Sequence, residues 1–321
     1  MEFVDKFFGL ETKVFSLSEP KYDNSKFLGR WRHFIEMINP VSLMYTAKEA
    51  QNAKDLLDDY KSGNLKTPVS DEKLWKARWL VESTYHPDTQ QPINKLFRFS
   101  CFIPVNIPIM IGMLLSPKNA FSIPFWQAVN QTYNVGFNYS NRNINNPFTN
   151  TQLAVSYLIA TSSSVVLAMG LDKVITKYAG NSLFLRTLGP ATAVAIAGCA
   201  NLLVVRYREL SEGVMVHDDQ GNPLGRSKLA AKDGLLKTTA IRFFMQYPLC
   251  FAPVVLASGL KGLGMYPAGG PGRLLAQVLC MSANLFIVLP ACFAAFPQII
   301  RTDKLEEDLV SPNGFSYNRG L

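Results

Sequence analysis

The sequence predicts an all-α, multi-pass membrane protein with about five transmembrane helices, further amphipathic or interfacial helices and a soluble helical N-terminal region. Only 17% of its 321 residues are charged, whereas about 25% is usual in soluble proteins. The deficit lies in the C-terminal two-thirds, where long apolar segments recur. We therefore divide the chain into a soluble or interfacial helical region (1–98), a transmembrane domain (99–296) and a C-terminal tail (297–321).

The net charge of +8 is spread along the chain. Basic and acidic residues alternate in the N-terminal part without forming a single run, so the charge favours contact with an anionic lipid bilayer over nucleic acid. The five cysteines form no C-x-x-C pair and all lie in apolar segments, as buried reduced thiols do. The three histidines are far apart in the sequence, so we predict no metal site and no cofactor.

The first residues, MEFVDKFFGLETKVF, mix acids and bases. They lack the basic and apolar regions of a signal peptide, and they are not the acid-poor, arginine-rich helix of a transit peptide. Any targeting information is therefore expected to be internal, without a cleavable presequence.

Two helices are predicted in the N-terminal region. Residues 46–49 form a capping box, helical spacing follows, and Gly63 ends the first helix. Ser70 can cap the second helix, which has acids in its first turn. The pair could form a hairpin lying on the membrane, with Trp75 and Trp79 at the level of the headgroups.

The next motif, HPDT, occupies residues 86–89. It holds an imidazole and a carboxylate in a turn at a helix end, so His86 and Asp88 could form a gate or latch near a substrate path. The alternative is an Asx-type turn in which Asp88 caps the next helix and His86 is incidental.

Five segments are long and apolar enough to be predicted as spans. They are residues 99–115, 153–171, 188–205, 243–260 and 274–296. None contains Asp, Glu, Lys, Arg or His. Prolines interrupt the first, fourth and fifth spans, a hydroxyl cluster occupies residues 161–164, and Asn201 and Asn284 are strongly polar.

An uncharged, amide-rich segment at 121–141 follows the first span. On a helix its amides fall three and four residues apart and share one face: Gln127, Asn130, Gln131, Asn134, Asn138 and Asn141. Amides donate and accept hydrogen bonds, so this face suits a small polar or zwitterionic solute, or another helix. We predict an interfacial or re-entrant helix; the alternative reading is that its amides only face water or headgroups.

The remaining connections are predicted as loops. Residues 211–237 are polar and include a tight turn, perhaps with a short hairpin. The glycine-rich stretch near 262–272 matches no phosphate-binding motif. Five spans place the two termini on opposite sides of the membrane, unless the amide-rich segment also crosses.

The residue types in the spans exclude some classes of membrane protein. Proton pumps and ion exchangers usually need an intramembrane ionisable residue, and membrane enzymes need a catalytic constellation, so neither class is predicted. Broken helices and neutral polar groups at membrane depth are typical of transporters of small solutes. The rival interpretation is a scaffold whose polar residues only hold helices together.

Motifs along nearly the whole chain resemble the sideroflexin family. They are FLGRWRHF (27–34), LWKAR (74–78), HPDT (86–89), FWQAVNQTYN and NYSNRN (125–143), ATAVAIAGCAN (191–201), RYREL followed by GN-x-LG-x-S-x-x-AA (206–231), and FPQ and NRGL near the C-terminus. One position departs from the pattern, because the common family form has glycine after HPDT and this chain has Gln90.

The resemblance implies a multi-pass protein of the mitochondrial inner membrane with five spans, its N-terminal part in the matrix and its C-terminus in the intermembrane space. It also implies transport of serine and related small neutral amino acids, such as alanine and cysteine, for one-carbon metabolism. Some family members are instead linked to iron or haem homeostasis or to assembly of respiratory complexes. An oligomer is compatible with the sequence.

On this reading the amide-rich segment and the third span bind the solute. The expected substrate-binding residues are Asn130, Asn134, Asn138, Asn141, Arg142, Thr192 and Asn201, with His86 and Asp88 as the latch. Arg142 would attract the carboxylate of the amino acid. Helix packing or capping is the alternative role for each of these residues.

Overall fold

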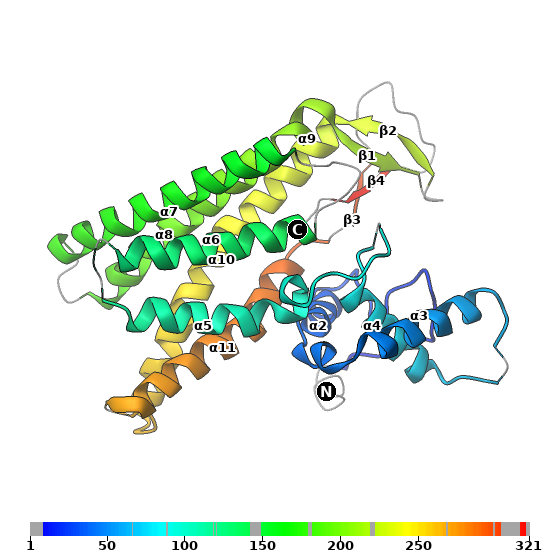
Figure 1. Ribbon diagram of the computed structural model, residues 1–321, viewed down its shortest axis with the longest axis horizontal. Coiled ribbons are helices and arrows are strands. Elements are labelled where there is room, and N and C mark those ends of the chain that lie inside the picture. Colours follow the sequence, from blue (N-terminus) through cyan, green and yellow to red (C-terminus); the bar gives the residue numbers. More distant parts are fainter. Residues whose placement is uncertain are drawn as a thin grey trace.

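The computed structural model describes residues 9–65, 67–87, 89–117, 119, 121–141, 149–178, 182–218, 222–267, 269–297, 299–302 and 315–318. The chain forms a helical N-terminal unit and a larger helix bundle, with a small β-sheet at one end of the bundle (Figure 1).

The N-terminal unit contains α2 (Phe27–Met37), the 3-10 turn η1 (Pro40–Met44), α3 (Ala47–Lys61) and α4 (Asp71–Thr84). The predicted capping box is confirmed, because Thr46 Oγ1 accepts the Glu49 N–H and the Glu49 carboxylate accepts the Thr46 N–H. Gly63 follows α3 with φ +70°, which is a backbone conformation that glycine adopts without strain. Ser70 precedes α4 as predicted, although its side chain makes no capping bond.

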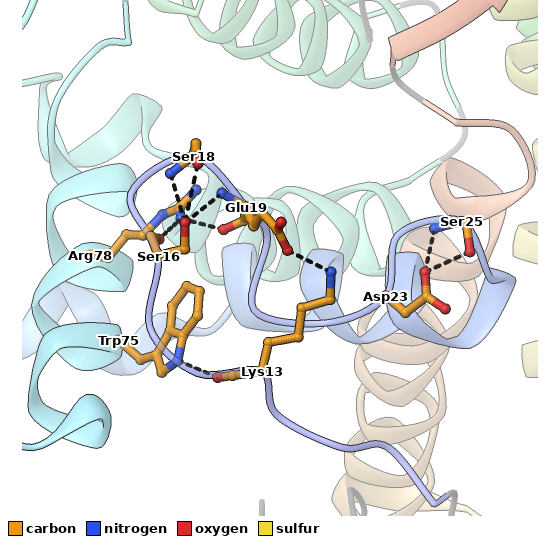
Figure 2. A network of polar contacts seen from close by, with 8 residues as sticks. All are labelled: Lys13, Ser16, Ser18, Glu19, Asp23, Ser25, Trp75 and Arg78. Carbon is orange, nitrogen blue, oxygen red and sulfur yellow. Dashed lines mark hydrogen bonds and ion pairs between the residues drawn. The ribbon is translucent and has the colours of Figure 1, made fainter.

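An N-terminal arm, residues 9–25, lies along α4 (Figure 2). Arg78 Nη1 donates to the carbonyls of Ser16 and Glu19, at 2.7 and 2.6 Å, and Trp75 Nε1 donates to the Lys13 carbonyl at 3.0 Å. Both donors belong to the LWKAR motif, so that motif holds the arm in place.

The predicted placement of the two tryptophans of α4 at headgroup level is wrong. Trp75 is only 7% exposed and packs against the ring of Phe15. Trp79 Nε1 donates to the Glu36 carbonyl at the end of α2, at 2.8 Å. Both indoles are therefore used inside the N-terminal unit, because their N–H groups find main-chain carbonyls there.

Helix α2 attaches the N-terminal unit to α11 (Gly270–Ala294). Arg30 Nε donates to the Ala294 carbonyl at 2.8 Å, one of the last carbonyls of α11, and so caps that helix. Trp31 Nε1 donates to the Ile287 carbonyl at 3.1 Å, one turn before Pro290. The FLGRWRHF motif thus supplies two side-chain donors to carbonyls of α11.

Six of the described helices pack in a closed ring, here called the helix ring, in which each helix contacts the next. They are α5 (Phe102–Leu115), α6 (Ser122–Ser140), α7 (Asn150–Tyr178), α8 (Leu183–Val205), α10 (Lys228–Gly262) and α11. Two 3-10 turns, η2 (Lys95–Phe97) and η3 (Phe99–Cys101), lead into α5. The five predicted spans fall on α5, α7, α8, α10 and α11, and the amide-rich segment forms α6.

Helix α6 is an uninterrupted helix that runs lengthwise between α5 and α7 (Figure 1). The predicted helix is thus present, and its interfacial or re-entrant position stays a prediction. Its amide side chains are partly buried in this arrangement.

Large apolar side chains cover the outside of the ring. Examples with half or more of the side chain exposed come from four of its helices: Leu158, Val166, Phe184, Phe244, Val255, Leu275 and Leu279. Within the described residues, α10 and α11 are each long and apolar enough to cross a membrane. An outer surface of this kind favours a lipid environment.

The purely α-helical prediction is incomplete, because the described residues also contain a four-stranded antiparallel sheet. Its order is β2 (Pro223–Ser227), β1 (Val214–His217), β4 (Phe315–Asn318) and β3 (Ile299–Thr302). The expected short hairpin is confirmed as β1 and β2, which follow the short helix α9 (Tyr207–Glu212). The C-terminal strands join it, and residues 228–237 begin α10 where a loop was predicted.

The sheet is held to the bundle by a small core. Val216, Ala230, Phe315 and Tyr317 are all buried together, and the Tyr317 hydroxyl donates to the Asp233 carboxylate on α10. The N-terminal unit lies at this same end of the bundle (Figure 1). The N-terminal unit and the described strands of the C-terminal tail therefore lie at one end of the bundle.

The described residues of the HPDT motif, His86, Pro87 and Thr89, lie in a turn between α4 and η2. The His86 N–H donates to the Gln91 carbonyl and the Gln90 N–H donates to the His86 carbonyl, each at 2.9 Å. Gln90 has φ +55°, in the left-handed region that favours glycine. The position where the family form has glycine is therefore the position where this turn needs a positive φ.

We predict that Gln90→Gly preserves or raises the melting temperature of the purified protein, whereas Gln90→Val lowers it. A β-branched residue in the left-handed region costs about 1–2 kcal/mol, and glycine removes that strain. Thermal unfolding of both variants in one detergent tests this. Equal melting temperatures for the glycine and valine variants would contradict a strained turn.

Candidate functional site

The candidate site centres on the amide face of α6, defined as Gln127, Asn130, Gln131, Asn134, Asn138 and Asn141. All six of these residues are partly buried, whereas Phe121, Phe125, Thr132 and Tyr139 on another face of the same helix are exposed. Phe121 is 77% exposed. The helix thus turns aromatic rings outward and amides toward the protein, the reverse of a helix on a water-soluble surface.

Close packing against α5 and the turns before it fixes this orientation. The Tyr133 ring is buried among the rings of Phe97, Phe102 and Phe137. A Cβ atom added to Gly136 would lie 2.6 Å from the Phe97 ring. The absence of a side chain at Gly136 therefore sets the rotation of α6 and, with it, the direction of the amide face.

The second close approach is between α5 and α6. A Cβ atom added to Gly112 would lie 2.0 Å from the Trp126 indole, and Trp126 Nε1 donates to Ser116 Oγ at 2.6 Å. The tryptophan ring thus lies directly over a glycine of α5. This contact anchors the N-terminal half of α6, as Phe97 anchors its C-terminal half.

The amides of α6 differ in what they bind. Asn141 Nδ2 donates to the carbonyls of Phe97 and Phe137, both at 2.8 Å, so this side chain ties the end of α6 to η2. Among the described residues, no hydrogen bond engages the side chains of Asn130, Asn134 or Asn138. Asn141 therefore has a structural role, and the other three remain available for a ligand.

Thr192 lies at the contact between α8 and α10. Its hydroxyl donates to the Leu188 carbonyl at 2.9 Å and lies 3.3 Å from the Tyr247 hydroxyl. Ala191 and Ala195 are fully buried, so the two helices approach closely. This hydroxyl pair is one polar contact in an otherwise small-residue interface.

Asn201 lies on α8, but its side chain is outside the described residues, as are Arg142 and Asp88 altogether. His86 is described and 6% exposed. Its Nδ1 lies 3.4 Å from the Thr89 N–H and accepts from it. His86 therefore helps to close its own turn, and it lies in the N-terminal unit.

Several buried polar atoms of the helix ring have no hydrogen-bond partner among the described residues. They are Tyr133 OH on α6, Thr161 Oγ1 on α7, Thr239 Oγ1 on α10 and Asn284 Oδ1 on α11. Buried hydroxyl and amide groups normally find partners. Thr161 belongs to the hydroxyl cluster that the sequence indicated.

One buried contact joins a proline to an amide. Pro253 has no N–H for the carbonyl of Leu249, four residues earlier in α10. Asn284 Nδ2 on α11 donates to that carbonyl at 2.8 Å. The sequence showed both residues, but it did not show that one compensates for the other.

Two cationic residues lie at one end of the helix ring; the sequence indicated Arg206 as an interfacial anchor, whereas Arg242 was missed because α10 begins well before the predicted span. Arg206, 8% exposed at the end of α8, binds Glu209 through two Nε contacts of 2.9 Å. Arg242, one residue before the predicted span, lies close enough to interact electrostatically with Arg206. One end of the ring therefore carries two cationic side chains beside its neutral polar groups.

In the part of the chain that the structure describes, no group of three His, Cys, Asp or Glu side chains is arranged to hold a metal ion, and all five cysteines are free thiols. Burial lowers the pKa of His33 in α2 below its ordinary value, so this imidazole is neutral at neutral pH. The neutral amides and hydroxyls at this site can donate and accept hydrogen bonds.

Comparison with known proteins gives consistent results. The family model described as "Sideroflexins" matches residues 16–321. Sideroflexin-5 from Homo sapiens is 35% identical over 316 residues, which cover 96% of this chain and 93% of that protein. No solved structure matches the chain.

Two further members of the family match the chain at similar sequence identities. A sideroflexin from Dictyostelium discoideum is 34% identical, covering 96% of this chain and 98% of that protein. Sideroflexin-3 from Rattus norvegicus is 33% identical, covering 95% of this chain and 98% of that protein. With nearly the whole chain matched by the family model and by these relatives, the chain belongs to the sideroflexin family.

Proposed function

We propose that this sideroflexin is a carrier of small neutral amino acids, serine foremost, across the mitochondrial inner membrane, where it supplies one-carbon metabolism. The orientation of α6 is the observation that supports this most. A helix with exposed aromatic rings and partly buried amides offers lipid an apolar face and offers a solute a polar one.

The chemistry of the amide face fits a zwitterion. The NH₂ groups of Asn130, Asn134 and Asn138 can donate to a carboxylate, and their oxygens can accept from an ammonium or a hydroxyl group. A neutral site of this kind needs no compensating charge when it is empty. Serine is small and carries both hydrogen-bond donors and acceptors, which distinguishes it from larger apolar amino acids at such a site.

The proposed membrane domain extends over residues 99–296 and consists of all six helices of the helix ring, one more than the five spans expected. Each helix leads back along the bundle from the end of the previous one (Figure 1). Six crossings place the region 1–98 and the tail 297–321 on one side. We propose the matrix side, which the family resemblance gives for the N-terminal part.

The contact between Arg30 and the Ala294 carbonyl supports this topology. It joins the N-terminal unit to the last residue of α11. Strand β4 of the tail pairs with β1, which precedes α10, through His217 and Ser316. These contacts support a topology in which the two terminal regions share one side of the membrane.

Uptake of labelled L-serine into liposomes that contain the purified protein tests the function. We predict saturable uptake by the wild type and at least a tenfold loss with Asn130→Leu combined with Asn134→Leu. Two lost hydrogen bonds to a charged solute justify a loss of this order. Tyr139→Leu, on the exposed face of α6, is the matched control and should keep wild-type uptake.

Each result of this experiment has a distinct meaning. Uptake retained in the double leucine variant would keep the function but remove the amide face as its site. No uptake by a folded wild type would favour the scaffold interpretation or a role in iron or haem homeostasis.

The topology is tested with one epitope tag at each end of the chain in isolated mitochondria. We predict that both tags stay protected from protease when only the outer membrane is ruptured. Cleavage of the C-terminal tag alone would show that an odd number of helices cross and would contradict six.

A further inference from the structure

We infer that Asn284 is a further solute-binding residue, whose side-chain oxygen accepts a hydrogen bond from the ammonium or hydroxyl group of the transported amino acid. The inference rests on the proposed function. It names a group on α11, whereas the amide face belongs to α6.

The side chain of Asn284 contacts α10 at the position where Pro253 removes one main-chain hydrogen bond. Only 7% of the residue is exposed, and its Nδ2 lies 2.8 Å from the Leu249 carbonyl. That carbonyl has no main-chain donor in its own helix because Pro253 stands four residues later. The contact therefore satisfies a backbone group that would otherwise be unpaired inside the bundle.

This contact also fixes which way the amide points. A carbonyl oxygen can only accept, so the NH₂ group of Asn284 must face Leu249. The Oδ1 atom must then point away from α10's carbonyl. It is buried, and it has no hydrogen-bond partner among the described residues.

A purely structural role does not account for this arrangement. An alanine at position 253 would restore the main-chain bond to Leu249, and an apolar residue at position 284 would then leave no polar atom unpaired. The pair Pro253 and Asn284 instead leaves one acceptor oriented and unused. A buried, rigidly held acceptor is what a binding site for a donor group requires.

The partner of this oxygen must be a hydrogen-bond donor. A carboxylate would place acceptor against acceptor, so Asn284 suits the ammonium or hydroxyl end of an amino acid. In the order of the helix ring, α6 lies opposite α10, which carries the Leu249 carbonyl. The NH₂ groups of the amide face are then free to take the carboxylate end.

A double variant separates binding from helix packing. Asn284→Leu alone leaves the Leu249 carbonyl unpaired and is expected to lower stability. Pro253→Ala with Asn284→Leu supplies a main-chain donor, so we expect its melting temperature to return toward that of the wild type. Its uptake of labelled L-serine in liposomes should nevertheless fall at least tenfold.

Two matched controls accompany the double variant. Pro253→Ala alone keeps Asn284, whose NH₂ group can still donate to the second lone pair of the Leu249 carbonyl, so this variant should transport serine. Ser282→Ala, on the same helix, removes a hydroxyl that donates to the Val278 carbonyl of its own helix at 2.8 Å, and it should transport like the wild type. If the double variant with leucine does not fold, Pro253→Ala with Asn284→Ala, which introduces a smaller side chain, tests the same loss of uptake.

The outcomes separate the inference from the proposed function. Wild-type uptake together with full uptake by a folded double variant would overturn the role of Asn284 and leave the carrier function in place. Loss of uptake in the folded double variant, with both controls active, supports it. Absence of uptake by the folded wild type would overturn the carrier function and the role of Asn284 with it.

Discussion

A polar side chain or carbonyl surrounded by lipid must find its hydrogen-bond partner within the protein. This constraint explains the main features of the helix ring. Its outer surface is apolar, its amide-bearing helix turns those amides away from the exposed face, and the carbonyl released by Pro253 is met by a side chain of the next helix. The same requirement that stabilises the bundle therefore concentrates neutral polar groups within it.

The terminal regions depend on the same requirement. Arg30 and Trp31 in the N-terminal unit donate to carbonyls near the end of α11, and Asn141 donates to the carbonyl of Phe97, the last residue of η2. The HPDT turn leads directly into η2 and then α5. The sequence of contacts from this turn through η2 to α6 gives the N-terminal unit a physical connection to the amide face.

Local signals predicted local structure well. The capping box at Thr46, the turn at Gly63 and the positions of the apolar helices follow from spacing and composition alone. The amide pattern of α6 also showed correctly that its amides share one face, since only helical periodicity is needed for that. The direction of this face could not be predicted, because it depends on contacts such as that between Gly136 and Phe97.

Contacts between distant segments account for the remaining differences. Strands β1 and β4 pair although about a hundred residues separate them, and neither short strand has a pattern that identifies its partner. The indoles of α4 looked suited to headgroups, but the arm and α2 cover them. The link between Pro253 and Asn284 requires knowledge of which helix faces the break, and the sequence alone does not contain it.

The central claim is that α6 faces lipid with its aromatic side and a solute path with its amides. Cysteine labelling in proteoliposomes tests it most directly, using Asn134→Cys and Phe125→Cys with the unsubstituted protein as the background. A small hydrophilic thiol reagent should label the cysteine at position 134, serine should slow that reaction, and the cysteine at position 125 should stay unlabelled. Labelling at position 125 but not at 134 would contradict the account.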